Sequence, residues 1–210
     1  VLFYKKKIKV KLALFLIALL ITMDLFINGF ALNPRLSKIF YEKEPESVKY
    51  LKKDSNFYRI IVYLKDTEES FLPEEKYKDA MENAKLTLHS NQNMIYKIYD
   101  VSGYDSIYVK RNYDFIKATI VNMPKIRYLA LFGVKYIITK QELKSELLEL
   151  VKDLKIIKIY RNKILLPHCY FMQNIRIIKK EDEYVYLLNN EFNPLKEVIV
   201  EGLNKINIKN

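Results

Sequence analysis

Several residue types that build metal sites, disulfides and phosphate-binding loops are scarce in this sequence. Its 210 residues include one cysteine (Cys169), two histidines (His89 and His168), four glycines and no tryptophan. A lone cysteine excludes an internal disulfide, and these three side chains are too few to complete a tetrahedral zinc site. No Walker loop, Gly-x-Gly-x-x-Gly, Gly-x-Ser-x-Gly or His-Glu-x-x-His motif occurs. We therefore expect no metal and no cofactor, and the sequence assigns no catalytic residue.

The net charge of +11 is not concentrated in an arginine-rich run. Five of the charges are lysines that precede the one long apolar run of the chain: Lys5, Lys6, Lys7, Lys9 and Lys11. The remaining excess is spread over a lysine-rich surface, and we expect no nucleic-acid partner. Acidic pairs such as Glu68-Glu69 lie in polar stretches, which favours solvated surface over acid–base chemistry.

The long apolar run covers residues 12–32, LALFLIALLITMDLFINGFAL. At about 1.5 Å per residue, a helix of this length just crosses a hydrocarbon core of roughly 30 Å. The preceding lysines hold their flank in the cytoplasm. We therefore expect a basic cytoplasmic flank (1–11), a transmembrane helix (12–32) in the cell membrane and an extracytoplasmic domain (33–210). A cleaved signal peptide and a buried core helix are the competing interpretations.

Two polar residues interrupt the apolar run. Asp24 and Asn28 are four residues apart, so they share one face of a helix. A carboxylate within a bilayer costs about 2.5–3.5 kcal/mol on insertion scales unless it finds a partner. Asp24 therefore lies near the outer interface, which we favour, or faces other transmembrane helices.

The part of the chain after residue 32 alternates between patterns typical of strands and of helices. We expect helices over 45–53, 77–88, 107–119, 124–133, 141–154 and 181–190. We expect strands over 57–64, 95–99, 134–139, 156–160, 163–171, 175–179 and 196–201, with 156–160 and 163–171 paired as a hairpin. This order predicts an α/β (α+β) domain with a mixed sheet.

The most distinctive stretch is Val101-Ser102-Gly103-Tyr104-Asp105-Ser106. It joins the expected strand 95–99 to the expected helix 107–119, which Asp105 or Ser106 would cap. Exposed N–H groups at the start of that helix, together with these side chains, would hold an anion or a sugar hydroxyl. Ser102, Gly103, Tyr104, Asp105 and Ser106 are thus the candidate ligand-binding residues, and a capped turn without a ligand is the competing interpretation.

The order of several motifs resembles the C-terminal extracytoplasmic portion of the YfhO-type family of bacterial membrane proteins. The matching pieces, which cover nearly the whole chain, are Asp24-Leu25, Arg59-Ile60, residues 101–106, Tyr113, residues 131–138, residues 159–162 and Leu166-Pro167. The chain departs from the family's pattern after Pro167, where His168-Cys169 stands in place of Arg-Ala.

The resemblance implies a polytopic, C-type glycosyltransferase-like enzyme that decorates cell-surface polymers from a lipid-linked sugar donor. In that class the acid that activates the acceptor lies on an early external loop between spans. We therefore expect this chain to be the last span and outer domain of such a protein, without its own catalytic site. Its expected partners are the lipid bilayer, other transmembrane helices and a surface glycan or lipid-linked sugar. The alternative is a free-standing single-pass surface protein that binds a glycan or a protein.

Overall fold

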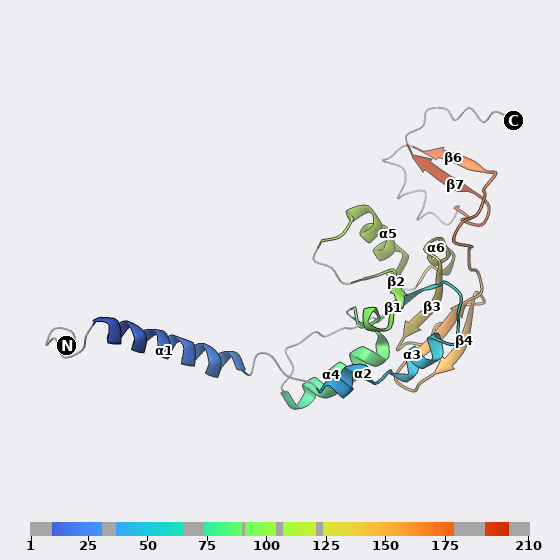
Figure 1. Cartoon of the computed structure of the whole chain (residues 1–210). Coiled ribbons are helices and arrows are strands. Elements are labelled where there is room, and N and C mark those ends of the chain that lie inside the picture. Colours follow the sequence, from blue (N-terminus) through green and yellow to red (C-terminus); the bar gives the residue numbers. More distant parts are fainter. Residues whose placement is uncertain are drawn as a thin grey trace. The chain divides into compact units, whose positions relative to one another are not determined.

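The computed structural model describes residues 10–30, 37–64, 74–89, 91–103, 107–120, 124–178 and 192–201. The chain divides into two compact units (Figure 1). The first contains Val1–Lys43 and Leu72–Lys78, and the second contains Glu44–Phe71 and Asp79–Asn210.

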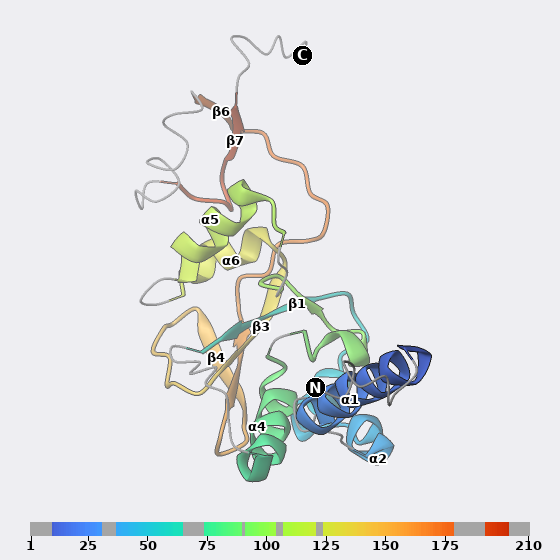
Figure 2. The same ribbon diagram turned by 90° about the vertical axis from the view of Figure 1, so that its left-hand side faces the viewer.

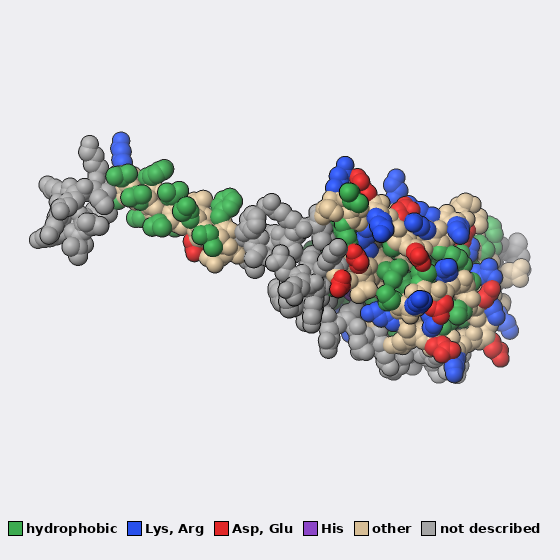
Figure 3. Space-filling view, turned by 90° about the horizontal axis from the view of Figure 1, so that it is seen from below, with side chains coloured by type: hydrophobic (Ala, Val, Ile, Leu, Met, Phe, Trp, Pro, Cys, Tyr) green, Lys and Arg blue, Asp and Glu red, His purple; other side chains and the backbone are tan. Residues whose placement is uncertain are grey.

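The first unit is dominated by a helix at the apolar run. This helix, α1 (Val10–Phe30), matches the expected transmembrane segment to within two residues at either end. Within the part of the chain that the structure describes, α1 is the one helix long and apolar enough to cross a membrane. Only 6% of this candidate span is buried inside the structure, and Figure 3 shows hydrophobic side chains along its visible face. A short helix, α2 (Lys38–Glu42), follows, and the side chain of Ser37 caps its first turn.

The second unit is built on a mixed five-stranded sheet, as the sequence predicts. The strands lie in the order β2-β1-β3-β5-β4. They are β1 (Arg59–Tyr63), β2 (Tyr99–Asp100), β3 (Val134–Thr139), β4 (Leu148–Asp153) and β5 (Lys158–Asn162). Strands β2, β1 and β3 are parallel, whereas β5 runs antiparallel to both β3 and β4. Two further strands, β6 (Ile175–Ile178) and β7 (Val198–Glu201), form a separate parallel pair.

Helices cover both faces of the central strands (Figure 2). The helices of this unit are α3 (Glu46–Leu51), α4 (Glu74–Thr87, of which the residues from Asp79 belong here), η1 (Met94–Tyr96, a 3-10 helix), α5 (Lys110–Ile120) and α6 (Ile126–Leu131). Residues from α3, η1 and the end of α4 pack with Ile60 and Ile138 on one face of the sheet. Residues from α6 pack with Ile61 and Ile137 on the other. Because neighbouring residues of a strand point to opposite faces, β1 and β3 are buried on both sides.

The prediction of a helix over 141–154 is wrong. Its leucines recur at helical spacing, but the structure places Leu143 and Leu147 in a loop and starts β4 at Leu148. Leu143 and Leu148 are buried against β3 and β5, whereas Leu150 is 48% exposed. Backbone pairing with β5 satisfies the hydrogen bonds that a helix would have made internally.

The hairpin expected from 156–160 and 163–171 is also wrong. β5 pairs with the strand before it, and a tight turn at residues 154–157 joins β4 to β5. In this turn the N–H of Leu154 donates to the carbonyl of Ile157 at 2.9 Å, and Lys155 has a positive φ of 65°. Residues 163–171 contain no strand. A third correction is at 95–99, where η1 precedes the two-residue strand β2. The helix expected over 181–190 lies outside the described residues.

Candidate functional site

The predicted ligand-binding loop begins directly after β2. Ser102 and Gly103 are both exposed, and Gly103 has a positive φ of 53° that suits glycine. Tyr104, Asp105 and Ser106 lie outside the described residues. The backbone N–H and the hydroxyl of Ser102 both donate to Oδ1 of Asp100, at 3.0 and 2.8 Å. The carboxylate of Asp100 thus holds the first turn of the loop through both donors of Ser102. A ligand would have to compete with Asp100 for these two donors.

Asp100 itself is a titratable group with a perturbed environment. Burial raises the pKa of its carboxyl group, and the two hydrogen bonds from Ser102 offset only part of this effect. The carboxylate lies at the end of β2, where Asp100 pairs with Ile60 of the central strand β1. A perturbed carboxyl group beside an exposed loop is a recognised mark of a functional site, although closed turns also perturb pKa values.

A cluster of exposed aromatic rings lies at the opposite end of β2. Phe57, Tyr99 and His168 form it, and we call these three residues the aromatic cluster. The ring of Phe57 lies 5.3 Å from that of Tyr99 and 5.0 Å from that of His168, between ring centroids. Phe57 is 52% exposed and Tyr99 is 60% exposed, so the cluster presents flat apolar surface to solvent. The sequence analysis did not group these three residues, because they come from distant segments of the chain.

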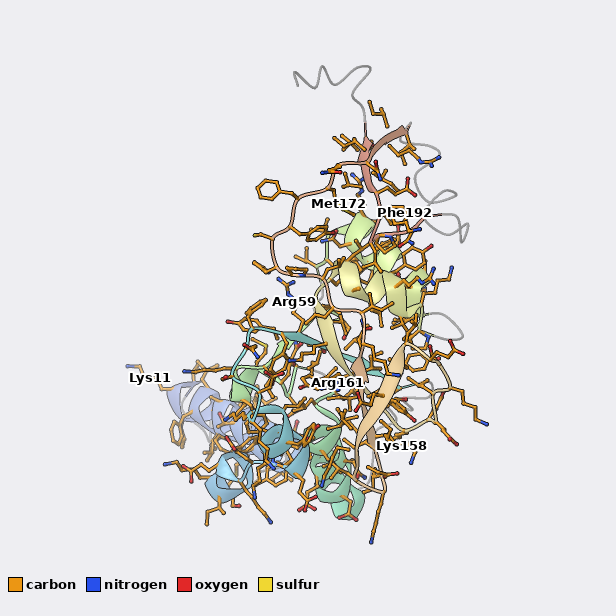
Figure 4. All side chains as sticks on the ribbon, turned by 90° about the vertical axis from the view of Figure 1, so that its right-hand side faces the viewer. Lys11, Arg59, Lys158, Arg161, Met172 and Phe192 are labelled. Carbon is orange, nitrogen blue, oxygen red and sulfur yellow. The ribbon has the colours of Figure 1, made fainter. Side chains whose placement is uncertain are left out.

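Arg59 adds a positive charge beside the aromatic cluster. Its guanidinium Cζ lies 5.3 Å from the centroid of the Phe57 ring, and Nη1 donates to the carbonyl of Phe132 at 2.9 Å. Figure 4 shows Arg59 next to the connection that follows β5. Arg59 forms no ion pair with any residue that the structure describes. A half-buried guanidinium held in this way keeps several donors for an anionic group.

Gly133 lies beside Arg59 and has a backbone conformation that favours glycine. Its φ of +68° is one that residues with a Cβ rarely adopt, and a Cβ there would lie 3.4 Å from Nη1 of Arg59. The carbonyl of Gly133 also accepts the N–H of Arg59 at 3.1 Å. These contacts fix the start of β1 against the start of β3.

Asn162 links β5 to two other elements of the α/β unit. This buried side chain donates from Nδ2 to the carbonyl of Val134 at 3.2 Å and to that of Ile126 at 3.5 Å. Its Oδ1 accepts the N–H of Ile164 at 2.9 Å. Asn162 thus ties the end of β5 to β3 and α6, and its contacts are structural.

A second titratable cluster lies where the loop before β1 meets β3. Oδ2 of Asp54 accepts hydrogen bonds from Nζ of Lys135 and, at 2.9 Å, from the hydroxyl of Tyr136. Burial alone would raise the pKa of Asp54, but the hydrogen bonds from Lys135, Tyr136 and the backbone of Asn56 outweigh it and lower the pKa. Burial, with the charge of Asp54 nearby, raises the pKa of Tyr58 to about 12. Asp54 and Lys135 thus form a compact ion pair whose role is structural.

The described residues contain no group of three or more His, Cys, Asp or Glu side chains that could hold a metal ion. The molecule is, in class, a mixed α/β domain joined to one strongly apolar helix. No protein-family model matches the chain, and no curated protein or solved structure matches it. Any functional assignment therefore depends on the features described above.

Proposed function

We propose that the chain is a membrane-anchored protein whose α/β unit lies outside the cell membrane. The observation that carries the membrane anchor is the surface of α1. Large apolar side chains are exposed along its whole length, from Leu12 (52%) to Ile27 (74%). A helix whose surface is this apolar requires lipid or protein around it, because it presents little polar surface to water.

We further propose that this unit is the outer domain of a larger, glycosyltransferase-like membrane protein and is not catalytic by itself. The polar pair in α1 supports this. Nδ2 of Asn28 donates to Oδ1 of Asp24 at 2.8 Å, which leaves the carboxylate with one donor from its own helix. Neighbouring helices would supply further donors. The contacts of Arg59, Gly133 and Asn162 are consistent with a structural role for the motifs that resemble those of YfhO-type proteins.

The native cysteine provides a direct test of membrane topology. Cys169 is the only cysteine of the chain and is exposed in the α/β unit. A membrane-impermeant maleimide added to intact cells should label it without permeabilisation. The matched control is Cys169→Ser combined with Lys5→Cys, which should be labelled only after permeabilisation. The reverse pattern would refute the proposed orientation, and recovery of the chain in the soluble fraction would refute the anchor.

A second test asks whether α1 packs against other helices. Asp24→Leu with Asn28→Leu should abolish co-purification of partner membrane proteins in mild detergent, while the chain remains in the membrane. Thr22→Leu is the matched control, since the Thr22 hydroxyl already donates to the carbonyl of Ala18 at 2.8 Å. Thr22 also lies on a different helical face from Asp24 and Asn28. Equal co-purification of partners with the wild type and both variants would show that the polar pair makes no such contact, and the absence of partners from all three would argue for a chain that spans the membrane alone.

The alternative function is a free-standing surface protein that binds a glycan or another protein. The aromatic cluster favours it, because exposed rings beside an arginine stack well on sugar rings. Under this alternative, Tyr99→Ala should weaken retention of the chain on isolated cell-wall polymer. Tyr41→Ala is a control, since Tyr41 is an exposed tyrosine on α2 in the first unit. Retention that is insensitive to Tyr99→Ala would remove the support for this alternative.

A further inference from the structure

The segment that leads into α5 exposes three consecutive apolar residues, which we call the apolar tip. Ile107, Tyr108 and Val109 are 91%, 55% and 68% exposed. Single exposed apolar side chains are ordinary on a protein surface, but a run of three in a row is unfavourable in water unless it has a function. We therefore expect the apolar tip to have an apolar partner.

The fold holds the apolar tip away from the core. In the second half of α5, Thr119 is buried, and the ring of Phe115 lies 6.2 Å from that of Tyr128 and 5.4 Å from that of Phe132. In the first turn of α5, residues 110–113 are all exposed. The helix is thus fixed by its C-terminal half, and its N-terminal end carries the tip into solvent.

Ring stacking orders the apolar tip. The rings of Tyr108 and Tyr113 are stacked, with centroids 4.2 Å apart and an interplanar angle of 24°. The N–H of Tyr113 donates to the carbonyl of Val109 at 3.1 Å, and Nζ of Lys117 lies 5.7 Å from the centroid of the Tyr113 ring. These contacts fix the tip before any partner arrives, which reduces the entropy lost on association.

The charge nearest in sequence to the apolar tip is positive. Lys110 follows the tip directly, is exposed and forms no ion pair within the described part of the chain. Arg111 is paired with Glu201 at 2.6 Å, and Asp114 lies half-buried one turn further along α5. Lys110 therefore favours an anionic surface beside the tip.

A bilayer is the apolar partner that the chain itself brings within reach. α1 ends at Phe30 and the α/β unit begins at Glu44, and this connection spans at most about 50 Å when fully extended. A unit of this size has a radius of gyration of about 15 Å, so any part of its surface can reach a bilayer that holds α1. Aliphatic side chains beside a tyrosine and a lysine also match the composition of membrane interfaces.

We infer that the apolar tip inserts into the interfacial region of an anionic bilayer. Ile107 and Val109 enter the boundary between headgroups and acyl chains, Tyr108 lies at the level of the headgroups, and Lys110 faces the lipid phosphates. The inference rests on the proposed membrane anchor, and it adds a second contact between the chain and the membrane.

A single tryptophan tests the insertion, because the native chain contains none. The full chain with Tyr108→Trp is reconstituted into vesicles of phosphatidylcholine and phosphatidylglycerol, with or without bromine on the acyl chains near the headgroup. Bromine quenches tryptophan on contact, so insertion to a depth of about 5–10 Å should reduce the emission about twofold and shift it to shorter wavelength. The matched control is Leu150→Trp, which should show neither change. Leu150 is 48% exposed on β4, at the opposite edge of the sheet from β2.

A second variant links the quenching to the aliphatic side chains. Ile107→Ser with Val109→Ser, added to Tyr108→Trp, should remove most of the quenching, while circular dichroism remains unchanged because both side chains are exposed. Absence of quenching at Tyr108→Trp in vesicles that carry the chain would overturn the inference. A spectral shift without quenching would also overturn it, because protein would then cover the ring.

Two other outcomes would count against the inference in different ways. Equal quenching of Leu150→Trp would show that the α/β unit contacts lipid without using the apolar tip in particular. Failure of the chain to float with the vesicles would refute the proposed anchor and, with it, the contact that depends on it.

Discussion

The ion pair between Asp54 and Lys135 should be the most strongly coupled charge pair of the α/β unit. Their side chains are 12% and 18% exposed, so solvent screens them less than it screens the surface pairs. Replacing Asp54 with Asn keeps a hydrogen-bond acceptor for Tyr136 but leaves the ammonium group of Lys135 without its counter-ion. A hydrogen bond to a charged group contributes about 1.5–3 kcal/mol, and we expect Asp54→Asn to cost about 2 kcal/mol.

The double-mutant cycle with Lys135→Met measures the coupling directly. Lys135→Met alone should cost about 1 kcal/mol, because Asp54 keeps the hydroxyl of Tyr136 at 2.9 Å. The double variant should be about 1 kcal/mol more stable than the sum of the two losses, since neither unpaired charge is left. For a protein of this size, 1 kcal/mol corresponds to a shift in Tm of roughly 2–4 °C. Thermal unfolding followed by the near-ultraviolet circular dichroism of tyrosine provides the measurement.

A second ion pair is the matched control for this cycle. Nη2 of Arg161 lies 2.5 Å from Oε2 of Glu149, but these side chains are 48% and 44% exposed. The cycle of Arg161→Gln and Glu149→Gln should give a much weaker coupling than the cycle at Asp54 and Lys135, because solvent screens this pair. If the two variants at Asp54 and Lys135 add within about 0.3 kcal/mol, the argument from burial is wrong.

Three further predictions concern stability. The pKa of Asp54 is lowered in the folded state, so its ionisation stabilises the fold at pH values above the unfolded pKa of about 3.9. This contribution should be lost as pH falls through the folded pKa. The acid limb of the stability–pH curve should therefore be flatter in Asp54→Asn than in the wild type. Gly133→Ala should lower the free energy of unfolding by roughly 1–2 kcal/mol, because alanine is strained at a φ of +68°. Gly29→Ala, at a position in α1 with open space around it, should not destabilise the chain. Equal melting curves for the two variants would contradict this prediction. Asn162→Ala should lower the unfolding free energy measured in urea by about 1–3 kcal/mol, since it removes the side-chain hydrogen bonds to buried carbonyl groups. A loss below about 0.5 kcal/mol would show that water replaces the amide.

The candidate site could be predicted only in part. The loop at Ser102 and Gly103 is signalled by local turn chemistry, which depends on neighbouring residues. The aromatic cluster brings Phe57, Tyr99 and His168 together from three segments, and no local pattern encodes that meeting.

The sequence by itself determined the elements whose signals are local and strong. The long apolar run specifies α1. The β-branched residues of Val134–Thr139 specify a strand buried on both faces, with the bounds that the structure has. Pro45 precedes α3 as its first-turn signal predicts. In each case residues close in sequence decide the outcome.

Only the tertiary structure decided which segments pair. Leu143, Leu147, Leu150 and Leu154 carry a helical period, yet Leu148–Asp153 forms a strand because β5 supplies hydrogen-bond partners and a buried face. The parallel pairing of β1 with β3 joins residues more than 70 positions apart, and the ion pair of Asp54 with Lys135 depends on it. Burial and backbone pairing across such distances outweigh the local propensity of a short segment.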